Sequence, residues 1–154
     1  MTVINPATQD PGIFEALRVG FKTERAAASL PQTAATSYFT VAGGRVLAYF
    51  VGEVTTVIQT QADVTKLVHS PATGTDSDMC ATLDITADEV GTLYTLTGTV
   101  GDAMVGGGQA GGIGQPFVLQ EGTVDLDCGA NNTGATKWTC YWIPLDDGAT
   151  VVTA

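Results

Sequence analysis

The residues of this chain that could do chemistry are few and scattered. His69 is the single histidine, and the three cysteines, Cys80, Cys128 and Cys140, have no close-pair spacing. A zinc site usually needs several histidines or a pair of closely spaced cysteines, so no metal site is expected. A serine, histidine and aspartate triad comes together only in the fold and stays open, although His69-Ser70-Pro71 is more simply a turn.

Carboxylates cluster at four places, and paired carboxylates can support acid–base chemistry or bind calcium. The clusters are Asp76/Asp78, Asp84/Asp88/Glu89, Asp125/Asp127 and Asp146/Asp147. None has the spacing of a complete calcium loop. Because the chain holds 16 acidic residues against 6 basic ones, solvated surface carboxylates are expected. We therefore predict no enzyme activity and no cofactor. A hydrolase that uses Asp146 or Asp147 is the least supported alternative.

A glycine-dense segment contains the spacing G-x-G-x-x-G at Gly106, Gly108 and Gly111. A dinucleotide site needs this motif between a strand and a helix, with the pyrophosphate at the helix N-terminus. Here Gln115-Pro116 and an expected strand follow instead. The segment is therefore predicted to be a surface loop.

Length and charge narrow the function classes. A chain of 154 residues is one ordinary domain. Its net charge of −10 disfavours binding to nucleic acid, which depends on Lys and Arg. The longest apolar run, residues 46–51, is too short to span a membrane. The first residues lack the pattern of a secretory signal, so we expect cytosolic synthesis and reduced, buried thiols.

The elements that must position these residues are mostly strands. Beyond Tyr38, short β-branched and aromatic runs alternate with glycine breaks. This pattern predicts an all-β domain over residues 37–154, a sandwich or small barrel with mainly antiparallel strands. Gly43-Gly44 is predicted to form a hairpin turn between the first two strands. The expected strands are 37–42, 45–51, 54–60, 65–69, 80–86, 92–99, 116–120, 122–127, 135–143 and 149–153.

Residues 1–36 are predicted to form a separate N-terminal arm. Asp10-Pro11 suits a helix start, and apolar residues then recur at helical spacing beside a basic stripe. We expect a short amphipathic helix over residues 12–27, followed by an extended linker. The apolar residues are Ile13, Phe14, Leu17 and Phe21, and the basic ones are Arg18, Lys22 and Arg25. The alternative is a helix packed on its own domain with a solvated charged face.

The C-terminal strand is apolar on both faces. Trp138 and Trp142 share one face of the strand, while Tyr141, Ile143 and Leu145 occupy positions of the opposite face. A strand of this kind is covered on both faces. One cover can come from the chain itself, and the other is predicted to come from a second copy, so the pattern indicates assembly.

Three stretches resemble small structural virion proteins of tailed bacteriophages: residues 39–47, residues 52–62 and residues 137–149. Within that group the chain is most similar to capsid decoration, or cement, proteins. The resemblance implies a virion protein on the capsid exterior, assembled in the host cytoplasm. It also implies a trimer that bridges and stabilises neighbouring major capsid proteins, with no role for nucleic acid or membrane.

Two sets of residues are expected to carry this function. Self-association is assigned to Trp138, Tyr141, Trp142 and Ile143, and capsid docking to Phe14, Leu17, Arg18, Phe21 and Arg25. A phage tail-tube or tail-tip protein would share the β-rich, acidic character. A carbohydrate-binding module would use exposed aromatics, with Trp138/Trp142 or Tyr38/Tyr49 as its platform.

Overall fold

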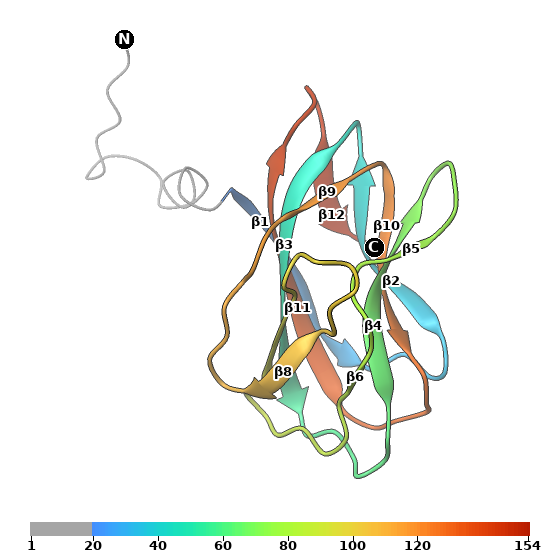
Figure 1. Cartoon of the computed structure of the whole chain (residues 1–154), viewed down its shortest axis with the longest axis vertical. Coiled ribbons are helices and arrows are strands. Elements are labelled where there is room, and N and C mark those ends of the chain that lie inside the picture. The colour runs from blue at the N-terminus through green and yellow to red at the C-terminus, as the bar shows by residue number, and fades with distance from the viewer. Residues whose placement is uncertain (1–19) are drawn as a thin grey trace, which may run out of the picture.

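The computed structural model describes residues 20–154, which form two antiparallel β-sheets. Most strands run along the long axis of the molecule, from β1 in dark blue to β12 in red (Figure 1). No helix occurs among these residues, and none of them belongs to a segment that could cross a bilayer as a helix. The all-β prediction is confirmed for this part of the chain.

The first sheet has the strand order β1-β11-β3-β7-β8, and β9 pairs with the end of β3 that β7 leaves free. The strand β11 lies one position from the edge of this sheet, between β1 and β3. The strands are β1 (Phe21–Ser29), β3 (Val46–Thr56), β7 (Leu93–Thr95), β8 (Val105–Gly108), β9 (Phe117–Leu119) and β11 (Ala135–Pro144).

The second sheet has the order β12-β2-β10-β4-β5, and β6 also pairs with β4. Here β10 is central, between β2 and β4. The strands are β2 (Ala35–Ala42), β4 (Val64–Pro71), β5 (Ser77–Asp78), β6 (Leu83–Asp84), β10 (Gly122–Cys128) and β12 (Thr150–Thr153).

The inner faces of the two sheets share one hydrophobic core, and β3 shows the inward side most clearly. In β3, Val46, Ala48 and Phe50 are buried while the residues between them are partly exposed. In β10, Val124 and Leu126 lie in the core, and Asp125 between them is buried on the other side of the strand. This period of two is the pattern of strands with one face inward. The three cysteines lie in this core, as the sequence predicted.

Consecutive strands often lie in different sheets, which corrects the predicted hairpin at Gly43-Gly44. The strand β2 belongs to the second sheet and β3 to the first, so the two are not paired. Both glycines have positive φ, 78° and 134°, a conformation that other residues rarely adopt. The turn therefore carries the chain from one sheet to the other.

The predicted helix over residues 12–27 is wrong for residues 20–27, and residues 12–19 lie outside the described residues. Phe21–Ser29 form β1, which pairs with β11, and the following Leu30 is buried in the core. Lys, Glu, Arg and Ala favour helices, but this preference is small for each residue. Pairing with the long strand β11 outweighs this helix preference here.

Candidate association surface

The two faces of β11 lie in different environments. Trp138 and Cys140 point into the core, and Trp138 is only 1% exposed. Its ring lies against Gly52 of β3 and stacks with Tyr94, with ring centroids 6.3 Å apart. Residues of the same chain therefore bury Trp138, and its side chain is not available for contact with a second copy.

The opposite face of β11 points away from the core. Ile143 is 43% exposed, and Tyr141 is partly exposed. In the register of the sheet, Tyr141 lies beside Tyr49 of β3, and Ile143 lies beside Leu47. The structure thus places these two predicted self-association residues on the outside of the first sheet.

Neighbouring strands extend this outward surface into an apolar face. Leu47 has Ile143 on one side and Val118 of β9, which is 60% exposed, on the other. A second row joins Tyr49 with Tyr141, and in a third Val51 lies beside Thr139. Together they form what we call the outer face of the first sheet: Leu47, Tyr49, Val51, Val118, Thr139, Tyr141 and Ile143.

Charged residues border this face on two sides. Lys137 and Glu53 are neighbours in the register, with Nζ and Oε2 3.2 Å apart. The contact raises the pKa of Lys137, because Glu53 favours its charged form. On β1, Lys22 Nζ lies 3.6 Å from Glu24 Oε2. An apolar patch with a polar rim is typical of a protein–protein contact site.

Trp142 lies at the margin of this arrangement. Its Nε1–H donates a hydrogen bond to Thr23 Oγ1 over 3.0 Å, and that hydroxyl donates to the carbonyl of Val151 over 2.8 Å. Phe21 covers its ring, with centroids 4.9 Å apart, and is itself 50% exposed. This chain of contacts links β1 and β11 of the first sheet to β12 of the second.

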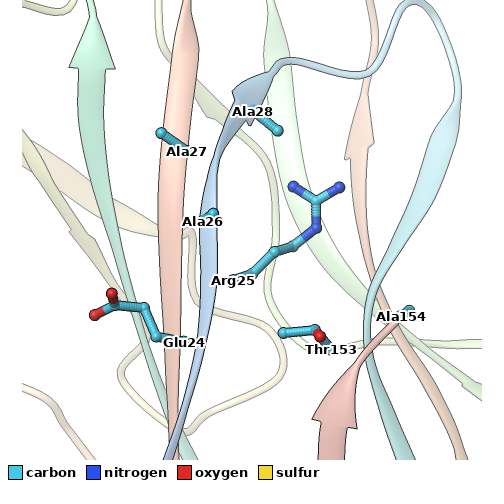
Figure 2. Close-up of a pocket in the computed structure, with 7 residues that line it drawn as sticks. All are labelled: Glu24, Arg25, Ala26, Ala27, Ala28, Thr153 and Ala154. Atoms are coloured by element: carbon cyan, nitrogen blue, oxygen red, sulfur yellow. The ribbon is translucent and has the colours of Figure 1, made fainter.

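A hollow of about 410 Å³ lies where β1 and β12 diverge. Its lining is small, from Ala26 to Ala28 on one side and Thr153 and Ala154 on the other (Figure 2). Arg25 projects across it, and its guanidinium carbon lies 3.9 Å from the ring centre of Tyr38. The predicted docking residues Phe21 and Arg25 are therefore both on β1. The others, Phe14, Leu17 and Arg18, lie outside the described residues.

Asp146, a residue of the hydrolase alternative, lies in an ion pair with Arg45. Asp146 accepts hydrogen bonds from the Arg45 guanidinium, with the closest N–O distance 2.8 Å, and these bonds hold its pKa well below the usual range. It therefore stays ionised in an ion pair. Among residues 20–154, no three His, Cys, Asp or Glu side chains gather to hold a metal ion.

Two carboxylates among residues 20–154 are buried, Asp125 on β10 and Asp63 directly before β4. Asp63 is fully buried, accepts the N–H of Ala130 over 3.1 Å, and donates its own N–H to Asp84 over 3.0 Å. Nearby, Asn132 donates to the carbonyl of Gln61. Burial raises the pKa of Asp63, although the backbone hydrogen bonds oppose this. The cluster fastens three loops together and is structural.

Sequence reasoning missed the part of the outer face that β3 and β9 contribute, namely Leu47, Tyr49, Val51 and Val118. The signal was present, because residues 46–51 are apolar at every position, as the C-terminal strand nearly is. The same logic that singled out Tyr141 and Ile143 applies to this run.

Comparison of the chain with protein-family models, with curated proteins and with solved structures finds no match.

Proposed function

We propose that this chain is a structural protein that decorates the outside of a tailed-bacteriophage capsid, where copies associate and bridge major capsid proteins. The observation that carries the proposal is the apolar outer face of the first sheet. Ile143 and Val118 are exposed, and they flank the partly exposed Leu47 in one row across the sheet. Covering such a face with protein is favourable, by about 25 cal/mol for each Å² of apolar surface removed from water.

The second sheet supports this choice of face by contrast. Its outward positions carry Thr123, Asp125 and Asp127 on β10, beside Ser70, Val68 and Lys66 on β4. Asp125 and Val68 are buried, and Ser70 donates its hydroxyl hydrogen to Asp125 over 3.0 Å. The exposed apolar residues of this sheet, Val64 on β4 and Val152 on β12, are not neighbours in the register. Because no continuous apolar row results, we assign association to the first sheet. The resemblance to decoration proteins then suggests the partner and the trimer.

The test is to measure the mass of the purified chain by light scattering and its co-sedimentation with undecorated capsids. We expect an oligomer that sediments with the shells. The variant Ile143→Lys with Val118→Lys should lose sedimentation with the shells and the association that the outer face provides, while Thr40→Lys on the second sheet serves as the matched control. A monomer that does not sediment with the shells contradicts the proposal. Stacking rings of six would favour the tail-tube alternative.

A carbohydrate-binding module is the second candidate, because aromatic rings are partly exposed on this sheet. The platforms expected from the sequence each lose a member to the core, since Trp138 and Tyr38 are both 1% exposed. The available aromatics are instead Tyr49 beside Tyr141, and Phe21 on Trp142. Titration with host polysaccharides, followed by Trp142 fluorescence, tests this candidate. A saturable shift would favour it over capsid decoration.

A further inference from the structure

The free edge of β1 can pair with another strand. β1 ends the first sheet on its side, and no strand among residues 20–154 pairs with its outer edge. Its backbone N–H and C=O groups there form a template for pairing. Phe21 to Arg25 pair with β11 without interruption, and the register shifts only between Arg25 and Ala28. Five regular residues therefore stand at this edge.

The charges on the outward side of this stretch are self-complementary. Lys22 lies beside Tyr141 and Glu24 beside Thr139, so both belong to the outer side of the sheet. Let a second β1 lie antiparallel with its Thr23 opposite Thr23 of the first. Lys22 then faces Glu24 of the second copy, and Glu24 faces its Lys22. Opposite charges at directly paired positions stabilise antiparallel strands.

The inward side of the same stretch is compatible with the same register. Figure 2 shows the Arg25 side chain on the opposite side of β1 from Glu24, and its guanidinium lies over the ring of Tyr38 of its own chain. Pairing about Thr23 places Arg25 opposite Phe21 of the second copy, whose ring is half exposed. Neither side of this register therefore places like charges opposite each other.

We propose that two copies of this chain join at β1, antiparallel and related by a two-fold axis at Thr23, so that the first sheet continues across both. A two-fold contact repeats each interaction twice with one surface patch. The inference goes beyond the proposed function, because it uses the strand edge and leaves the outer face of the first sheet free. In a shell, this contact would link neighbouring assemblies by a second symmetry.

The opposing interpretation is that these features protect an exposed edge. Charged side chains and a local irregularity are also how natural proteins prevent edge-to-edge pairing. The two interpretations differ in their response to charge reversal. A protective edge has no partner to repel, whereas a paired edge does.

The experiment is a charge swap followed by analytical ultracentrifugation over a range of concentrations. In Lys22→Glu, two glutamates face each other at both ends of the pairing, and in Glu24→Lys two lysines do. We expect each single variant to raise the dimer dissociation constant at least tenfold. The double variant should restore it, and so should an equimolar mixture of the two single variants, which forms only the heterodimer.

Controls separate the edge contact from folding and from the outer face. Lys22 and Glu24 are exposed, so circular dichroism and the unfolding temperature should stay unchanged. Lys66→Glu breaks a comparable ion pair with Asp78 on the far strands and should leave the dimer intact. The series is repeated with Ile143→Lys, which removes the outer-face contact. A monomeric wild type, or a mixture that fails to restore the dimer, overturns the inference, whereas loss of capsid binding alone bears only on the proposed function.

Discussion

The two sheets share one core but differ on their outward faces. The first sheet shows water a continuous face of leucine, valine, isoleucine and tyrosine, whereas the second shows mainly hydroxyls and charged groups, with Val64 and Val152 exposed apart from each other. Inward, both present the same kind of buried aliphatic and aromatic side chains. Folding alone needs one apolar face on each sheet. The second apolar face of the first sheet is therefore the feature that folding leaves unexplained and that the proposed association would explain.

The largest expected effect is a loss of stability from a substitution on the inner side of the first sheet. Trp138→Ala removes a side chain that is 1% exposed and leaves a cavity beneath Tyr94. We expect the free energy of unfolding to fall by about 3–5 kcal/mol, the usual cost of truncating a buried tryptophan. Chemical denaturation of the wild type and the variant measures it. A loss below about 1 kcal/mol would show that Trp138 is not a core residue.

The second effect is on association through the outer face of the same sheet, without a loss of stability. Ile143→Lys with Val118→Lys places charges on an exposed apolar row. Association should weaken more than tenfold, which corresponds to about 1.4 kcal/mol, with little change in the unfolding temperature. Light scattering against concentration follows it. Equal association by this variant and by Thr40→Lys would remove the difference between the two faces.

The third effect concerns the polar face of the second sheet. Asp125→Ala leaves the Ser70 hydroxyl without the carboxylate it now contacts at 3.0 Å. The expected loss of stability is about 1 kcal/mol, the usual contribution of one hydrogen bond, with no change in association. Asp127→Ala, two positions along the same strand, should stay within about 0.5 kcal/mol of the wild type. If Asp125→Ala instead abolished association, the roles of the two faces would be reversed.

The smallest effect is a pH dependence at the end of the second sheet, where Asp63 precedes β4. Burial raises the pKa of Asp63 in the folded state above its unfolded value. The folded state therefore holds this proton more tightly, and stability falls as pH rises from the unfolded to the folded pKa. Asp63→Asn should flatten that fall, with a gain at neutral pH of no more than about 1 kcal/mol. Unfolding at several pH values between 3 and 8 tests it, and an unchanged slope would contradict it.

Most strands of the core could be predicted from the sequence, and residues 122–127 and 135–143, expected as strands, occur as β10 and β11. The prediction of a surface loop for the glycine-dense segment is wrong at its start, because Val105–Gly108 form β8, which pairs with β7. The expected strands 45–51 and 54–60 overlap one strand, β3, which runs through Gly52 beneath the Trp138 ring and ends at Thr56. A Cβ at position 52 would lie 2.6 Å from that ring. A glycine needed for space and one needed for a turn look the same in a sequence.

The candidate surface was predictable only in part. The apolar positions of β11 were visible, but the sequence could not tell which face turns inward. That depends on the register with β3, which puts Trp138 over Gly52 and Tyr141 beside Tyr49. Likewise, Phe21 and Arg25 share a side at helical spacing and also at strand spacing. Their shared side was therefore predicted, while the element that carries them was not.

The position of β11 between β1 and β3 has a consequence for how the protein is made. Both strands form ladders with β11, although it comes near the end of the chain. During translation, β1 cannot join the first sheet until residues 135–144 have left the ribosome. Contacts so distant in sequence are slow to form. A message truncated shortly before codon 135 would yield a chain in which β1 has no partner and the long, apolar β3 pairs only with the short strands β7 and β9, a product suited to aggregation and to removal by proteases.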